Sequence, residues 1–448
     1  MANLDGMNHT RRPLTTALAF LALAGPGLGA VAFGGQPSTP SQSGLVEVFA
    51  ADGTMAWARV ELPSTPLSDA ETARFAQGQV HTLHESGPSD NRFDLVIVGD
   101  GYTAQEQELF HAHARAKMAA IAGIEPFTTY LDFVNIWMVD VVSTESGVDN
   151  DPFPGAPVDT ALDMEFWCQG IERLLCVDQG KATAAAAAAP EVDHVLVLAN
   201  STKYGGAGGL VATSSGDNPA SDLVTIHELG HSIAGLADEY EYYARAGLSD
   251  DSTEDVTIPA PGLSGLPGQE PSGVNITAAS SDEAMAAEEL KWFRWLGADS
   301  PDGGKVGQFE GGGYSPAFIY RPTQDSLMHT LGIAEGGNVF NVVAIEQFVA
   351  KFHQFVEVVT DASPRDNGKG ARKLAIEVED LGAVAFEVRW FLDGVEVLSS
   401  RGKTSFVVTP PIAAATASVT VEVSDTTAWV RDPALIAEHL TETRSWSV

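Results

Sequence analysis

Two histidines four residues apart, His227 and His231, carry the chemistry that this chain most clearly indicates. Residues four apart on a helix lie on the same face, so both imidazoles can reach one metal ion. Glu228, next to His227, can reach a water molecule on that metal without being a ligand. Catalytic zinc takes three protein ligands and keeps one position open for water. The segment therefore predicts a zinc site in which Glu228 is the general base of a hydrolase.

The flanking residues predict that this segment lies on a helix. Asn218 is expected as the N-cap, with Pro219 in the first helical position. Apolar and small residues then recur at helical spacing, at Leu223, Ile226, Gly230 and Ile233. Gly235 is expected to end the helix, where a left-handed residue is usual. A chain that turns at Gly235 can fold back towards the metal, where Asp238 and Glu239 are both candidates for the third ligand.

The segment resembles the zinc-binding pattern of the metzincin metallopeptidases, which reads His-Glu-x-x-His-x-x-Gly-x-x-His, or Asp in the last place. This chain has one extra residue before the glycine, but the step from Gly235 to Asp238 keeps the metzincin spacing. The resemblance thus implies Asp238 as the ligand. Glu239 would then be a charged residue flanking the helix or would hold a histidine tautomer by a hydrogen bond. It also implies that Met328, within residues 325–329, belongs to a Met-turn that forms an apolar floor under the metal. His329 is expected to be structural.

Some metzincins place a tyrosine two residues after this methionine, where it stabilises the transition state. This chain has Thr330 there. Tyr314 and Tyr320 are therefore candidates to contact the substrate instead.

The chain also resembles a narrower group, the M64 family named for bacterial IgA peptidases, over roughly residues 90 to 350. The resemblance rests on an ordered series of short segments at 100–103, 125–127, 143–149, 168–173, 204–209, 275–277, 291–292, 311–314 and 320–322. Family members tend to carry cysteines where this chain has Ser326 and Val343, so no disulfide is expected there.

The N-terminal residues predict export. Arg11-Arg12 precede an apolar run that ends in small residues, so residues 1–32 are predicted to be a signal peptide. A membrane anchor is the alternative, but glycines and Pro26 interrupt the run. In an exported chain Cys168 and Cys176 are expected to pair. The expected location is secreted or periplasmic in a bacterium.

The net charge of −35 argues against nucleic acid or an anionic membrane as the partner. After signal removal no other segment is apolar and long enough to span a membrane. The expected partner is a protein or peptide substrate.

The spacing of apolar residues and the local composition divide the rest of the chain into regions. Residues 33–89 are predicted to be a linker and a small β-rich region or propeptide, in which His81 and His84 lie on the surface. Residues 90–365 are predicted to form an α/β (α+β) metzincin-like catalytic domain with a twisted mixed sheet. Its buried strands are expected at 95–98, 134–139 and 194–198, and a helix at 105–124.

Gly205 and Gly206 lie in a glycine-rich segment. The resemblance to metzincins implies that this segment is the edge strand that pairs with a peptide substrate, and the alternative is a flexible loop. From about residue 370 the apolar period becomes two, and Asp393-Gly394 indicates a hairpin turn. Residues 370–448 are therefore predicted to be an immunoglobulin-like β-sandwich. The chemistry is expected to be complete without them.

The predicted function is that of a secreted zinc metallo-endopeptidase. The alternative is a secreted binding or adhesion protein with a vestigial zinc site. Glu228 favours the enzyme, because binding alone does not need that carboxylate beside both histidines.

Overall fold

The computed structural model describes residues 42–49, 55–62, 66–170, 172–240 and 270–448, apart from residues 272, 314, 333–334, 367–371 and 409–416. The predicted signal peptide therefore lies outside the described residues, as does Tyr314. Within the part described, no helix combines the length and the apolar character needed to cross a membrane.

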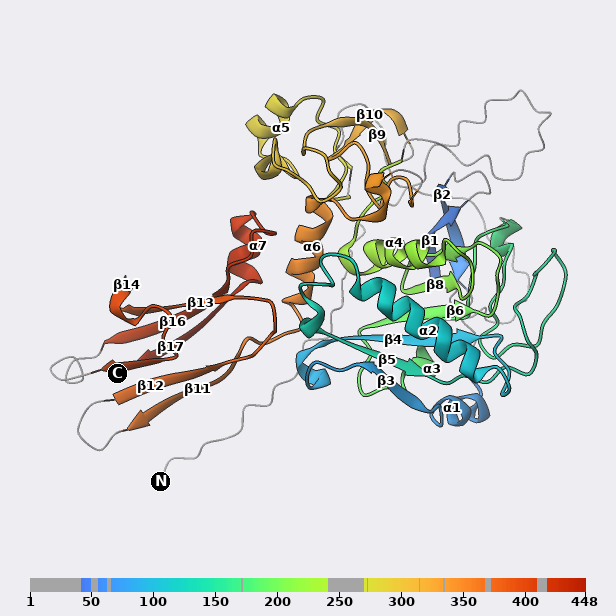
Figure 1. Cartoon of the computed structure of the whole chain (residues 1–448), viewed down its shortest axis with the longest axis horizontal. Coiled ribbons are helices and arrows are strands. Elements are labelled where there is room, and N and C mark those ends of the chain that lie inside the picture. The colour runs from blue at the N-terminus through green and yellow to red at the C-terminus, as the bar shows by residue number, and fades with distance from the viewer. Residues whose placement is uncertain are drawn as a thin grey trace, which may run out of the picture. The chain divides into compact units, whose positions relative to one another are not determined.

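A six-stranded mixed sheet organises the larger part of the fold (Figure 1). Its strands in spatial order are β3 (Val80–His84), β5 (Val134–Val139), β4 (Phe93–Asp100), β6 (His194–Ala199), β8 (Val211–Ser215) and β7 (Gly206–Ala207). The four central strands are parallel, and the two edge strands, β3 and β7, are antiparallel to their neighbours. The mixed α/β architecture and the strands predicted from apolar runs are thus confirmed.

Both faces of this sheet are buried, which explains why its central strands read as continuous apolar runs. Along β4, Leu95 and Ile97 enter one core while Val96 and Val98 enter the other. The first core is filled by helices α2 (Gln107–Ala122), α4 (Ser221–Ala234) and α6 (Val342–Phe352). The second is filled by α1 (Asp69–Phe75) and α3 (Gln179–Ala186).

The N-terminal strands β1 (Gln42–Phe49) and β2 (Met55–Leu62) form an antiparallel hairpin. The β-rich pattern predicted for residues 33–89 is therefore present. Strand β3, however, pairs with β5 inside the main sheet, so that sheet begins before the expected boundary at residue 90.

A smaller region lies between the end of α4 and α6. It holds α5 (Asp282–Glu288) and the antiparallel pair β9 (Phe309–Gly312) and β10 (Ser315–Arg321). Trp292 and Trp295 are buried in its core. Short 3₁₀ helices occur at Ser89–Asn91, Leu131–Phe133, Cys168–Gly170, Phe293–Trp295, Glu335–Asn338 and Leu398–Ser400.

The C-terminal strands form two sheets that share a buried core. One sheet contains β11 (Val359–Asp366), β12 (Arg372–Val378) and β15 (Ser405–Val408); the other contains β14 (Val395–Glu396), β13 (Phe386–Leu392), β16 (Ser418–Asp425) and β17 (Thr441–Ser447). Helix α7 (Pro433–Glu438) precedes β17. The predicted hairpin turn is present, since β13 pairs with β14 and Asp393 and Gly394 have φ of 48° and 80°.

The C-terminal sheets are tied to the α/β part by buried polar groups. The Asp425 carboxylate accepts a hydrogen bond from Tyr130 Oη at 2.7 Å and lies 3.0 Å from His353 Nε2. Glu346 in α6 accepts from the backbone N–H groups of Arg431 and Asp432. The apolar cores of the two parts are also continuous. A chain truncated near residue 367 would therefore expose a large buried surface.

Asp425 provides a direct test of this junction. Replacing Asp425 with alanine is expected to lower the free energy of unfolding by about 1–3 kcal/mol, because a buried tyrosine hydroxyl loses its acceptor. Denaturant unfolding measures the loss. Glu438→Gln, an exposed change in α7, is the control and should leave the stability unaltered. Equal stability of both variants would show that these hydrogen bonds contribute little to the free energy of unfolding.

Candidate metal centre

The helix that carries the histidine motif, α4, follows β8 directly and crosses the first core of the sheet. The helix begins at Ser221 with Ala220 as its N-cap, so the predicted N-cap role of Asn218 is wrong. Asn218 instead accepts from the backbone N–H of Ala220 and of Ser221, which makes it part of the turn before the helix. The predicted stop is confirmed: Gly235 has φ of 64° and closes the helix by bonds to the carbonyls of Gly230 and His231.

His227, His231 and Asp238 converge on one point. The two Nε2 atoms lie 3.0 Å apart, and Asp238 Oδ1 lies 3.3 Å from His227 Nε2 and 3.2 Å from His231 Nε2. The side chains of His227 and Asp238 are fully buried. The chain reversal at Gly235 is what returns Asp238 to the face of the helix that carries the histidines.

The hydrogen bonds behind the two histidines determine which nitrogens face each other. His227 Nδ1 lies 2.9 Å from the carbonyl oxygen of Leu327, and His231 Nδ1 lies 2.8 Å from that of Leu236. A carbonyl only accepts, so each Nδ1 carries the proton and each neutral ring turns its Nε2 lone pair inwards. Two lone pairs and a carboxylate oxygen within 3.3 Å of one another repel unless a cation lies between them.

The donor set fits zinc. Ligands about 2.0–2.1 Å from a tetrahedral zinc lie about 3.3 Å apart, close to the separations seen here. The carbonyls of Leu327 and Leu236 would then orient the histidines from outside the metal.

Met328 lies directly beneath this helix. Its side chain is fully buried, and a Cβ added to Gly230 would lie 2.9 Å from Met328 Sδ. The glycine inside the histidine motif is therefore what lets the methionine approach the helix. The carbonyl of the preceding residue, Leu327, accepts from His227, so the same turn contacts both the helix and one of its clustered histidines.

Glu239 does not join the ligand cluster. Its carboxylate accepts hydrogen bonds from Ser326 Oγ at 2.6 Å and from the side-chain amides of Asn275 and Asn341 at 2.9 Å. Burial raises the pKa of Glu239, and these donors act in the opposite direction. Its backbone N–H donates to the carbonyl of Met328. Glu239 thus fastens the segment that carries Asp238 to the turn that carries Met328.

The Glu228 carboxylate lies against the glycine-rich edge of the sheet. A Cβ on Gly206 would lie 3.5 Å from Glu228 Oε1, and one on Gly208 would lie 2.5 Å from Oε2. Strand β7 is the outermost strand of its sheet and pairs with β8, while on its other side Gly206 forms a parallel bridge with Leu174. Gly205 instead packs against Phe166.

Gly208 tests how closely this edge sets the position of Glu228. Gly208→Ala should leave zinc in place and lower kcat by about 10²-fold, because displacing a reacting group by about 1 Å can cost that much. Steady-state kinetics and zinc analysis measure the two effects. Gly307→Ala is the control, since its added Cβ would meet nothing closer than 3.7 Å. Unaltered kcat in Gly208→Ala would show that the carboxylate moves aside without cost.

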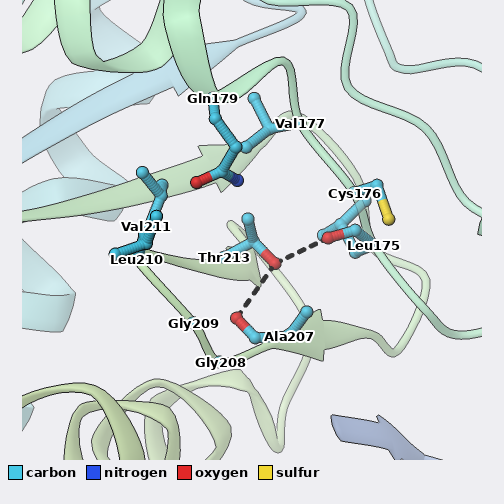
Figure 2. Close-up of a pocket in the computed structure, with 10 residues that line it drawn as sticks. All are labelled: Leu175, Cys176, Val177, Gln179, Ala207, Gly208, Gly209, Leu210, Val211 and Thr213. Carbon is cyan, nitrogen blue, oxygen red and sulfur yellow. Dashed lines mark hydrogen bonds between the residues drawn. The ribbon is translucent and has the colours of Figure 1, made fainter. Parts of the chain in front are cut away.

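A small cavity lies behind this edge strand (Figure 2). It has room for about one water molecule. Thr213 crosses it by donating to the carbonyl of Leu175 at 2.7 Å. The cavity is therefore too small to hold a substrate side chain.

The remaining predicted residues lie in different places. His329 is 3.0 Å from Asp325 Oδ1 and outside the ligand cluster, which fits its expected structural role. Tyr320, in β10, pairs through its backbone with Thr277 and is half-buried. Cys168 and Cys176 form a disulfide.

Four residues around the site were assigned no such role from the sequence. Three of them hold Glu239 and one faces Glu228: Ser326, Asn275, Asn341 and Gly208. Asn275 and Gly208 did lie in segments that carried the family resemblance.

Residues 81–301 match the family model described as IgA Peptidase M64. The matched stretch includes most of the sheet, α4 and all three clustered ligands, and it ends before Met328. The predicted family resemblance is thereby confirmed over these residues, and the matched family is one of peptidases, which act on proteins or peptides. A comparison with curated proteins gave no match.

Proposed function

We propose that this chain, which carries an M64 peptidase segment at residues 81–301, is a secreted zinc-dependent endopeptidase. The observation that carries the proposal is the convergence of His227, His231 and Asp238 beside the Glu228 carboxylate. Two imidazoles and one carboxylate are a typical set of protein ligands for a catalytic zinc, which keeps a further position for water or substrate.

The roles of the residues follow from their positions. His227, His231 and Asp238 would hold zinc, which when bound lowers the pKa of water and polarises a carbonyl oxygen. Glu228 follows His227 directly on the same helix and does not coordinate in this arrangement. Its carboxylate accepts the proton of the attacking water and afterwards passes it to the leaving amine of the peptide.

The site is assembled before substrate arrives. Leu327 and Leu236 keep the two histidine rings in one tautomer, and Glu239 keeps the Asp238 segment on the Met328 turn. Such preorganised ligands do not have to be ordered during the reaction, which lowers the barrier.

The segment that contains β7 provides a way to bind an extended peptide. The outward backbone N–H and carbonyl of Gly206 already bond with Arg173 and Leu175, so a substrate strand can add through main-chain hydrogen bonds only beyond Gly206. The absence of side chains at Gly206 and Gly208 lets this segment lie close to Glu228. This mode of binding places a scissile carbonyl near the metal and favours cleavage within a chain.

The proposed export of the protein agrees with the disulfide Cys168–Cys176 and with the acidic composition.

The test is digestion of a mixture of unfolded proteins by the purified chain, with N-terminal sequencing of the products. We expect internal cleavage that stops with a zinc chelator and returns on adding zinc. A protein that contains zinc and still cleaves nothing in the mixture would support the binding or adhesion alternative.

A further inference from the structure

We propose that His81, His111 and Asp140 form a second zinc site, separate from the one that holds the catalytic metal. One ligand atom from each residue lies within 4.8 Å of the others. The three residues come from three different elements: His81 from β3, His111 from α2 and Asp140 from the residue directly after β5. None of them contributes to the cluster around His227.

The pairing of β3 with β5 brings His81 and Asp140 together. His81 lies opposite Met138 in the β3–β5 ladder, and Asp140 follows Met138 by two residues. Residues two apart on a strand share a face, so Asp140 projects on the side of Met138. That is the side of the core filled by α2, where Met138 packs with Phe110. His111 follows Phe110 on α2 and completes the group.

The rings and the carboxylate face one another through the atoms that bind metals. His81 Nε2 lies 3.0 Å from Asp140 Oδ2, and His111 Nε2 lies 2.7 Å from Asp140 Oδ1. The two imidazole rings are 4.5 Å apart between centroids, close to the 4.7 Å between the rings of His227 and His231. The second group thus repeats the donor set of the catalytic one: two imidazoles through Nε2 and one aspartate.

The environment suits a structural zinc with one water ligand. The exposed fractions of the His81, His111 and Asp140 side chains are 26%, 11% and 17%, so solvent reaches the site from one side. Imidazole donors favour zinc over calcium or magnesium, which prefer oxygen ligands.

A metal here would act on the edge of the main sheet. Strand β3 is an edge strand, held on one side by β5, and its ladder is irregular between Thr82 and His84. A zinc ion that joins β3 to α2 and to the end of β5 would cross-link three elements, and metal bound only by the folded state adds its binding energy to stability.

The first test is metal content after gel filtration in zinc-free buffer. The full-length chain, loaded with zinc alone, is expected to hold two zinc ions, His81→Ala one, His227→Ala one and the double variant none. His84→Ala is the matched control, because His84 lies on the same strand but contacts the carbonyl of Leu131 instead. It should keep two ions. Wild-type protein that holds a single ion, or His81→Ala that holds as many as the wild type, would overturn the proposal.

A second measurement needs no substitution and therefore does not depend on how the variants fold. Crystals of the wild-type chain grown with zinc should give an anomalous peak at the zinc edge between His81, His111 and Asp140. The alternative is a metal-free group in which both histidines donate Nε2–H to Asp140, and it gives no peak there. A peak only at His227 and His231 would establish that alternative and exclude the second site.

Discussion

Replacing Glu228 with glutamine will leave zinc and fold in place and lower kcat by about 10²–10⁴-fold, the usual contribution of a general acid or base. The amide has the size of the carboxylate and lies on the same buried helix, but it cannot take the proton from the attacking water. Hydrolysis of a fluorogenic peptide measures kcat, and elemental analysis measures the zinc. KM should change little, since Glu228 holds neither the metal nor, in the proposed binding mode, the peptide backbone.

The same chemical change at an exposed site is the control. Glu283→Gln, on the surface of α5, should have wild-type kinetics. Wild-type activity in Glu228→Gln would remove the proposed mechanism. Loss of zinc together with activity would instead mean that Glu228 supports the metal.

Replacing the clustered ligands one at a time is expected to have the second large effect. His227→Ala, His231→Ala and Asp238→Ala should each lose the catalytic zinc and with it the peptidase activity, because a three-ligand site cannot spare a ligand. Glu239→Gln should weaken zinc binding by only about 10–100-fold, as expected of a residue that orients ligands without touching the metal. Competition with a chelator of known affinity measures each constant.

The order of these effects separates the two acidic residues. Asp238 Oδ1 lies within 3.3 Å of both histidine Nε2 atoms, whereas Glu239 is held by Ser326, Asn275 and Asn341. If Glu239→Gln lost zinc and Asp238→Ala retained it, the ligand roles would be exchanged. His329→Ala is the histidine control and should retain the catalytic zinc, because His329 pairs with Asp325 outside the cluster.

Local patterns in the sequence predicted the secondary structure around the site. The four-residue step from His227 to His231, the helix stop at Gly235 and the Asp393-Gly394 turn each depend on neighbouring residues alone. Continuous apolar runs likewise predicted β4, β5 and β6, because strands buried on both faces have no polar side. Such features can be read from a single sequence because the interacting residues are close along the chain.

Long-range packing decided what those patterns left open. Asp238 and Glu239 are adjacent in sequence, and only the positions of Ser326, Asn275 and Asn341 show which of them is held away from the metal. Gly208 and Glu228 meet because β7 lies at the sheet edge beside α4, a contact that no spacing rule encodes.

His81 and Asp425 show the same limit. His81 was expected on the surface, but the β3–β5 register and α2 turn it towards Asp140 and His111. Asp425 ends a strand of the C-terminal region, yet it accepts a hydrogen bond from Tyr130 in the α/β part.

The sequence by itself determined the helix, the motif and the family resemblance, since these lie in contiguous residues. Only the tertiary structure decided which distant polar groups meet, because that depends on strand order and register.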